Sequence, residues 1–237
     1  LRSAAANTQT DILMREAKIL NVTWDQVQRF FVGEEPTLIM LGPDAIQRTL
    51  SDQANMLVNR IELTTPDYYQ QVEEWCEVYA PDLATKLEPI EISNPNFHLG
   101  LFDYRDIVPQ IDELFQPYFV LPGGATVIIQ ETAALIAIDV NRGADERSSL
   151  AINLDVAAEI ARHLRLRNLG GTIMIDFLRM KDKAENQKLQ EALARFINDD
   201  DPCTVQIHGL TKLGLMEMTR QRRTPPLLER YESVVAG

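Results

Sequence analysis

Two apolar stretches that each end in an aspartate, Ala134–Asp139 (ALIAID) and Thr172–Asp176 (TIMID), decide the fold of this chain. Between them lies Ile152–Leu166, where apolar side chains recur at helical spacing. A strand, a helix and a second strand in this order normally form a parallel pair with a right-handed crossover. The carboxyl ends of both strands then lie at one edge of the sheet, where open α/β sheets usually place their sites. If the strands are neighbours or next-neighbours, we expect Asp139 and Asp176 to lie a few ångströms apart.

The residues around this unit extend it to a larger mixed α/β fold. A turn at Leu121–Gly124 (LPGG) precedes two strands, Thr126–Gln130 and Ala133–Val140, which we expect to form a hairpin. The helix over Ile152–Leu166 should end at the glycines of Asn168–Gly171. Three further elements follow: a helix over Lys183–Asn198, a strand over Thr204–His208 and a final helix over Gly214–Gln221. The predicted order of this half is therefore β-β-α-β-α-β-α.

The first half of the chain contains shorter predicted elements. The pattern predicts four helices, over residues 8–32, 45–55, 66–79 and 109–119. It also predicts two short strands, over residues 37–41 and 60–63. Residues 81–100 read as mostly irregular.

Charge is distributed unevenly along the 237 residues, whose formal net charge is -12. Residues 1–138 hold 8 Lys and Arg against 20 Asp and Glu, whereas residues 139–237 hold 15 of each. The second part is locally basic around Arg162–Arg167, Arg179–Lys183 and Arg220–Arg223. An acidic protein with a local basic track can still bind phosphates, because the field near a site matters more than the total charge.

Composition also narrows the class of protein. Hydrophobic residues make up 45% of the chain, enough for a folded core, and no apolar run is long enough to span a membrane. Cys76 and Cys203 lie far apart and outside any C-x-x-C motif, which does not support a zinc site or a disulfide framework. Two scattered cysteines fit a reducing compartment, so we expect a cytoplasmic protein.

The two strand-end aspartates are the strongest candidates for chemistry. Asn141 lies two residues after Asp139, so its side chain should leave the strand on the same face. Two carboxylates and an amide form an oxygen-only cluster, which suits a hard cation such as Mg²⁺. Such a cation can activate a water and stabilise charge on a phosphate. The competing interpretation is that Asp139 and Asp176 only cap the turns that follow their strands.

The other polar motifs are less informative. His98, His163 and His208 are isolated along the sequence, and we expect structural roles for them. Neither a readable Ser/His/Asp arrangement nor the phosphate-binding G-x-x-x-x-G-K-[ST] motif occurs in the sequence.

Several segments, in order and at matching spacing, resemble the ribonuclease E/G family over residues 121–223. They are Ala137–Asn141 (AIDVN), Glu159–Gly171 (EIARHLRLRNLGG), Ile175–Phe177 (IDF) and Gly214–Arg222 (GLMEMTRQR). The similarity is looser in residues 1–120.

The resemblance implies a fold, a site and a reaction. It implies a 5′-sensor-like region over residues 1–50, an RNase H-like region over 51–112 and a DNase I-like catalytic domain over 113–237. Asp139 and Asp176 would bind Mg²⁺, and Asn141 would help to orient the site. The family cleaves single-stranded RNA internally, leaving a 5′-phosphate and a 3′-hydroxyl. The pair Arg2-Ser3 matches the family's Arg-Thr pocket for the RNA 5′-monophosphate, with Ser keeping the hydroxyl.

Five basic residues are candidates for contacts with the RNA backbone. Arg165 and Arg167 lie near a predicted helix C-terminus, where they could instead interact favourably with the helix dipole. Lys212, Arg220 and Arg222 flank the last segment of the resemblance, which favours an RNA contact.

The sequence also departs from the family pattern. It contains no stretch resembling the family's S1 domain, and residues 224–237 contain no zinc-link cysteine. Arg179 stands where the family often has Asp, three residues after the second metal ligand. We nevertheless expect a homo-oligomer, such as a dimer. The alternatives are a non-catalytic RNA-binding or scaffold relative of the same fold, and a metal-dependent phosphatase or DNA nuclease on a similar sheet.

Overall fold

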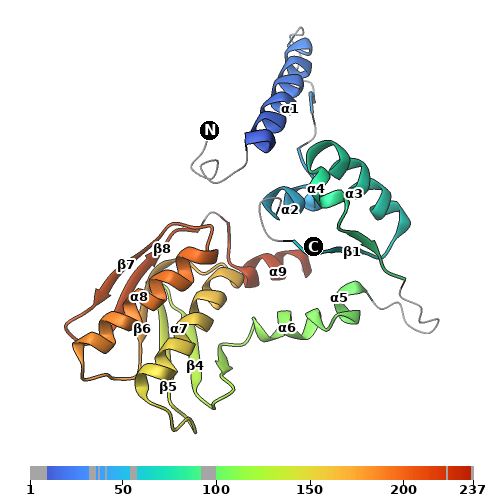
Figure 1. Ribbon diagram of the computed structural model, residues 1–237. Coiled ribbons are helices and arrows are strands. Elements are labelled where there is room, and N and C mark those ends of the chain that lie inside the picture. The colour runs from blue at the N-terminus through green and yellow to red at the C-terminus, as the bar shows by residue number, and fades with distance from the viewer. Residues whose placement is uncertain are drawn as a thin grey trace. The chain divides into compact units, whose positions relative to one another are not determined.

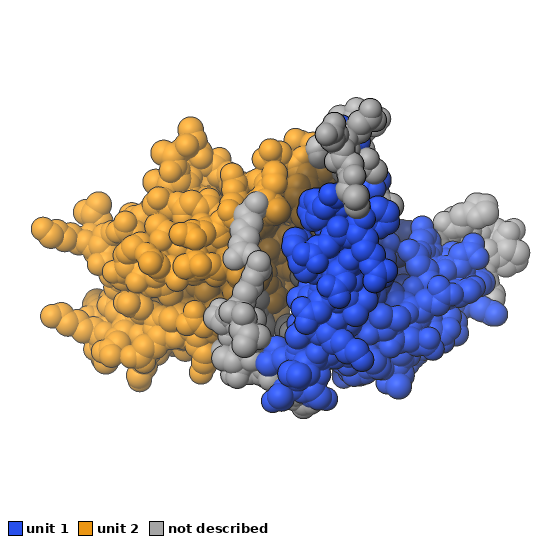
Figure 2. Space-filling view, turned by 90° about the horizontal axis from the view of Figure 1, so that it is seen from above, with its two compact units in different colours: residues 1–105 blue, residues 106–237 orange. Residues whose placement is uncertain are grey.

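The computed structural model describes residues 10–31, 36, 38–40, 42–53, 58–91, 100–222 and 224–235. The chain divides into two compact units, residues 1–105 and residues 106–237, which Figure 2 shows in different colours. Each unit has its own hydrophobic core. None of the helices in the described ranges combines the length and the apolar character that crossing a membrane requires.

Unit 2 is built on a mixed six-stranded sheet with the strand order β3-β4-β5-β6-β8-β7 (Figure 1). The strands are β3 (Tyr118–Val120), β4 (Thr126–Glu131), β5 (Ile136–Asn141), β6 (Gly171–Asp176), β7 (Val205–Leu210) and β8 (Met216–Arg220). β5 and β6 are parallel, and the other neighbouring pairs of this sheet are antiparallel. The helices of this unit are α6 (Ile107–Glu113), α7 (Ser149–Leu166), α8 (Lys183–Asp200) and α9 (Leu227–Val235).

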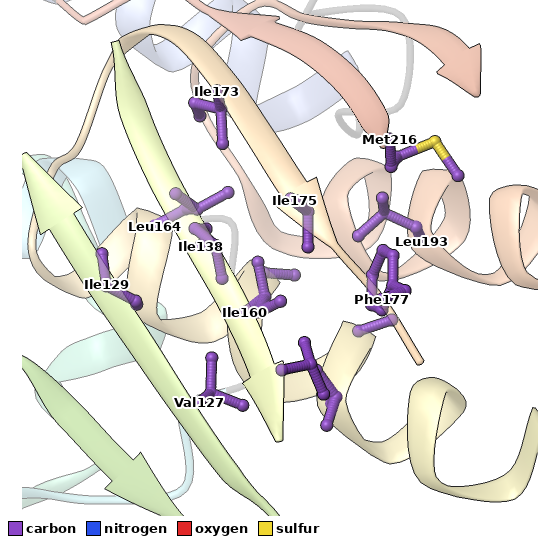
Figure 3. Close-up of a cluster of buried hydrophobic side chains, with 14 of the residues drawn as sticks. Val127, Ile129, Ile138, Ile160, Leu164, Ile173, Ile175, Phe177, Leu193 and Met216 are labelled. Atoms are coloured by element: carbon purple, nitrogen blue, oxygen red, sulfur yellow. The ribbon is translucent and has the colours of Figure 1, made fainter. Parts of the chain in front are cut away.

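The core of unit 2 lies between the sheet and the two long helices α7 and α8, which cover one face of it (Figure 1). Ile138 and Ile175 point from neighbouring strands toward Ile160 of α7, as Figure 3 shows. Burying an aliphatic side chain of this size stabilises the fold by about 1.5–3 kcal/mol. The core therefore fixes which side of each strand turns inward.

Successive side chains of a strand point to opposite faces, so the residues between the core positions turn to the other face. On β5 these residues include Asp139 and Asn141, and on β6 they include Asp176. All three are exposed. The sheet thus has one apolar face under the helices and one face that carries the polar side chains.

The parallel crossover unit and the hairpin are confirmed. β4 and β5 pair antiparallel, and β5 and β6 are direct neighbours joined by α7. The final helix predicted over Gly214–Gln221 is wrong, because Met216–Arg220 is a strand in the middle of the sheet. Met216, Met218 and Arg220 are buried and alternate with half-buried residues, which is the period of a strand.

Two smaller differences concern helix ends. Residues 109–119 do not form one helix: α6 ends at Glu113, and Tyr118–Val120 joins the sheet as β3. The residue that ends α7 is Asn168, with a left-handed φ of 51°, rather than a glycine. The Leu169 amide donates to the Leu164 carbonyl across it, as in a Schellman ending.

Unit 1 has a small core, formed mainly by α3 and the segments next to it. Its helices are α1 (Thr10–Arg29), α2 (Ala45–Gln53), α3 (Pro66–Tyr79), α4 (Pro81–Ala84) and α5 (Leu101–Tyr104). Its strands β1 (Ile61–Leu63) and β2 (Leu87–Pro89) form a parallel pair. None of the residues of α1 is buried. Of the strand predicted over residues 37–41, only 38–40 are described, and they are not a strand.

The mixed α/β class is therefore confirmed for this chain. The finer likenesses to DNase I, to RNase H and to a 5′ sensor stay predictions. So do the subdomain boundaries expected near residues 50 and 112.

Candidate functional site

Asp139 and Asp176 are register partners at the carboxyl ends of the two parallel strands β5 and β6. Neighbouring strands lie about 4.8 Å apart, and partners in register turn their side chains to the same face. The two carboxylates therefore lie side by side, and both are exposed. The sequence predicted this juxtaposition from the crossover connection, and the register confirms it.

Asn141 stands beside this pair on the same face of β5. Its Nδ2 donates a hydrogen bond of 2.7 Å to Oδ2 of Asp139. This bond holds the Asp139 carboxylate in one orientation. It leaves the other oxygen, Oδ1, available to a ligand.

The loop that follows β5 is held by its own charged residues. The Arg147 guanidinium and backbone amide both donate to the Asp145 carboxylate, and these bonds hold the pKa of Asp145 below its usual range. Arg142 donates to the carbonyl oxygens of Asp145 and Arg147 and to the Ser149 hydroxyl. A side chain at Gly123 would collide with the Asp145 carboxylate, which explains a glycine in the preceding turn. This network fixes the backbone directly after the site.

Asn153 holds the segment that follows β6. It is fully buried in the first turns of α7, and its amide group bonds both ways with the backbone of Leu178. The Asn153 Nδ2 donates to the Leu178 carbonyl at 2.8 Å, and the Leu178 amide donates to Oδ1 at 3.0 Å. Sequence reasoning missed this residue, because an asparagine within a helix gives no signal of a partner 25 residues away.

Basic side chains gather at the same end of the sheet as the two carboxylates. Arg179 and Lys181 follow β6, Lys183 begins α8, and Lys212 lies in the turn before β8. All four side chains are exposed. The N-termini of α7 and α8 also point to this end, because each helix follows one of the two strands, and helix N-termini carry partial positive charge. The sequence signal for Arg179, Lys181 and Lys183 was the basic run at Arg179–Lys183, and Lys212 was predicted from its place beside the last segment of the resemblance.

Four of the five predicted RNA-backbone residues lie at the opposite end of the sheet. Arg165 and Arg167 lie at the C-terminal end of α7, and Arg220 is the register partner of Gly171 at the start of β6. Arg222 follows β8 at this end. Asp176 lies five residues after Gly171 along β6, a distance of about 17 Å. Only Lys212 lies at the end that carries the carboxylates.

Arg220 is also enclosed by the protein. Its side chain is 1% exposed, and it forms a two-bond ion pair with Asp201 at 2.7 and 2.9 Å. A further guanidinium nitrogen donates to the Leu169 carbonyl at 2.6 Å. These bonds occupy the donors that a phosphate would need, so the position of Arg220 does not support an RNA contact.

Arg167 is likewise buried, and its side chain contacts His163. Its Nε donates to Nδ1 of His163 at 3.1 Å, and the His163 ring stacks on Phe119 with centroids 4.1 Å apart. Burial, assisted by the positive charges of Arg167 and Arg162, lowers the pKa of His163 to about 4. His163 is thus a neutral structural residue at neutral pH. Arg2, Ser3 and His98 lie outside the described residues.

The chemistry of the site follows from its donor set. Two carboxylates and one amide offer oxygen atoms, which Mg²⁺ prefers over nitrogen or sulfur ligands. Within the described ranges, no three or more His, Cys, Asp or Glu side chains gather as a larger metal site would require. Two carboxylates with open neighbouring positions fit Mg²⁺, which usually keeps several waters and takes its remaining ligands from a phosphate.

A family model described as "Ribonuclease E/G family" matches residues 1–223. The match includes both halves of the chain and both strand-end aspartates.

Curated relatives agree with this match. A protein named ribonuclease E from Buchnera aphidicola is 36% identical over 237 residues, which cover 97% of this chain and 24% of the relative. A ribonuclease E from Haemophilus influenzae is 31% identical over 236 residues, with 97% and 25% covered. A ribonuclease G from Salmonella typhimurium is 31% identical over 229 residues, with 94% and 46% covered. The chain thus spans less than half the length of each of these relatives.

Proposed function

The chain belongs to the ribonuclease E/G family, and we propose that it is a metal-dependent endoribonuclease that cuts single-stranded RNA at the Asp139–Asp176 pair. The observation that carries this proposal is the register of β5 and β6, which makes the two exposed aspartates direct partners. Capping of a turn by a single aspartate would not require a second aspartate opposite it.

In the proposed reaction, a phosphodiester bond of RNA is hydrolysed to a 5′-phosphate and a 3′-hydroxyl. Asp139 and Asp176 would hold Mg²⁺, which when bound supplies an activated water and neutralises charge on the phosphate. Asn141 keeps the Asp139 carboxylate oriented through its 2.7 Å hydrogen bond. Removing a hydrogen bond that orients a metal ligand in this way typically lowers metal affinity or activity by about 10–100-fold.

The surrounding charges would hold the substrate. Arg179, Lys181 and Lys212 are exposed at the carboxylate end and are suited to phosphate oxygens of the RNA backbone. The N-termini of α7 and α8 add partial positive charge at the same end. We further propose, from family membership, that Arg2 and Ser3 bind a 5′-monophosphate and that the protein acts as a homo-oligomer in RNA processing or decay in the cytoplasm.

The test is cleavage of a labelled single-stranded RNA by the purified chain with and without Mg²⁺. Asp139→Asn and Asp176→Asn should each lower the rate by roughly a thousandfold, because the metal contributes several kcal/mol to such reactions. Asp112→Asn, at an exposed aspartate of α6, is the matched control and should cleave at the normal rate. Unchanged cleavage by the two site variants would refute the proposal.

The same assay separates the alternatives. A non-catalytic RNA-binding or scaffold protein would bind RNA equally well with and without a chelator and would release no products. A phosphatase or DNA nuclease would act on a phosphomonoester or on DNA in preference to RNA, so these substrates are included beside it.

A further inference from the structure

The hairpin turn between β7 and β8 lies at the same end of the sheet as the two carboxylates. β8 runs antiparallel to β6 and pairs Met216 with Ile175, the residue before Asp176. The turn that precedes β8 therefore projects beyond the sheet beside Asp176. Its tip consists of Lys212 and Leu213.

Hydrogen bonds fix the backbone of this turn. Two hydrogen bonds join Thr211 and Leu215. The Thr211 amide donates to the Leu215 carbonyl at 2.8 Å, and the Leu215 amide donates to the Thr211 side-chain hydroxyl at 3.1 Å. The Gly214 amide donates to the Thr211 carbonyl at 3.0 Å, with Gly214 at a positive φ of 91°. These bonds stabilise the turn without any contribution from the side chain of Leu213.

Leu213 is nevertheless a large apolar residue, and 81% of it is exposed. This is the highest exposed fraction among the large apolar side chains that the structure describes. Single exposed apolar residues are common on protein surfaces and by themselves require no explanation. Leu213 differs because the turn holds it at a fixed place, next to a lysine and next to the candidate site.

We propose that Leu213 contacts the face of an RNA base next to the scissile phosphate, while Lys212 contacts the adjoining backbone. This inference rests on the proposed function, because it assumes that RNA lies at the carboxylate pair. Leu213 lies about two residues past the position opposite Asp176, or roughly 10 Å from it, given strand rise and spacing. A strand of RNA bound at the carboxylates reaches that far. An aliphatic side chain packs on any base face without reading its edge, so Leu213 positions the strand without selecting its sequence.

The experiment measures fluorescence anisotropy of a labelled single-stranded RNA of about ten nucleotides, a length within usual site sizes, in EDTA. Chelation prevents cleavage, so the reading reports binding alone. Leu213→Ala should weaken binding roughly fivefold, by loss of part of an apolar contact. Leu213→Trp should tighten binding, because an aromatic ring stacks on a base more strongly. Leu166→Ala, an exposed leucine at the opposite end of α7, is the matched control and should bind normally.

The outcomes separate this inference from the proposed function. If Leu213→Ala and Leu213→Trp both bind RNA with the affinity of wild type, and Mg²⁺-dependent cleavage is intact, only the role of Leu213 is overturned. Weaker binding by Leu213→Ala and tighter binding by Leu213→Trp, with no cleavage under any condition, would support contact between Leu213 and an RNA base but overturn the nuclease proposal. A chain that binds no RNA would overturn both. Thermal melting of each variant should match wild type, because Leu213 lies outside the core.

Discussion

The two ends of the six-stranded sheet use charged residues in opposite ways. At the end with Asp139 and Asp176, the carboxylates and the nearby Arg179 and Lys181 are exposed. At the other end, Arg220 is buried and its donors are directed to protein atoms. The two ends are separated by about 17 Å of strand. One end leaves its charged groups exposed, as the proposed site requires, and at the other end Arg220 is bound to protein atoms.

This difference shows why clusters of basic residues in a sequence are ambiguous. In the sequence, Arg162–Arg167 and Arg220–Arg223 are basic runs just as Arg179–Lys183 is. Burial and the pairing of strands decide which of them can reach a phosphate. Four predictions test the contrast between the two ends.

The largest effect is expected at Arg220. Arg220→Ala leaves the buried Asp201 carboxylate without its partner, which should lower the free energy of unfolding by about 3–5 kcal/mol. The exposed Arg222→Ala at the same end should change it by less than about 0.5 kcal/mol. Urea denaturation measures both variants. Equally small losses of unfolding free energy in both variants would show that the ion pair of Arg220 does not stabilise the fold.

The second effect is a loss of stability in acid caused by His163. Its pKa is lowered to about 4 by burial and by Arg167 and Arg162, from an ordinary value of 6.5. The unfolded chain therefore takes up a proton on this residue before the folded chain does. The free energy of unfolding is therefore unaffected by His163 above about pH 6.5. It falls by up to about 3 kcal/mol as the pH is lowered from 6.5 toward 4.

Urea denaturation as a function of pH measures this effect. His163→Gln removes the titrating ring, so the dependence between pH 6.5 and 4 should become shallower by this amount relative to wild type. A slope that His163→Gln leaves unchanged would mean that other groups cause the acid loss. Only the difference between slopes is compared, so a less stable variant remains informative.

The third effect is expected at the end of the sheet with Asp139 and Asp176, where Asn153 forms hydrogen bonds with the backbone of Leu178. Asn153→Ala leaves a buried donor and a buried acceptor unpaired, which should cost about 2 kcal/mol of stability. It should also slow RNA cleavage at temperatures where the variant is folded, because the segment after Asp176 loses its anchor. Ala194→Gly in α8 lowers stability through helix propensity, by about 1 kcal/mol, and serves as the control. A loss of activity no greater than in this control would contradict a positioning role.

The smallest change in stability is expected at Lys181. Lys181→Ala should leave unfolding within about 0.5 kcal/mol of wild type, because the side chain is exposed. RNA affinity should nevertheless fall, and the slope of log affinity against log salt should decrease by about 0.7 for a lost contact to a single strand. Anisotropy titrations in increasing NaCl measure the slope. An unchanged slope would contradict a contact between Lys181 and the RNA backbone.

Sequence reasoning located the candidate pair but not its surroundings. The two runs that end in Asp139 and Asp176, with a helix between them, were sufficient to predict a parallel pair and a shared edge. The helix predicted over Gly214–Gln221 was wrong, because the strand that forms there has five residues, too few to distinguish a strand from a helix by period. Asn153 and Arg220 were missed as structural residues, since their partners lie far away in the sequence.

The sequence by itself determined the crossover unit, the family resemblance and the place of the two aspartates at strand ends. The crossover unit and the strand-end aspartates follow from local periodicity and from the fixed hand of strand–helix–strand connections. The resemblance follows from segments that match in order and spacing. Only the tertiary structure decided that β8 lies between β6 and β7, that Arg220 is buried, and that Lys212 and Leu213 lie beside Asp176. The physical reason is that strand pairing and burial join residues distant along the chain, and residue type alone does not encode which partner each one meets.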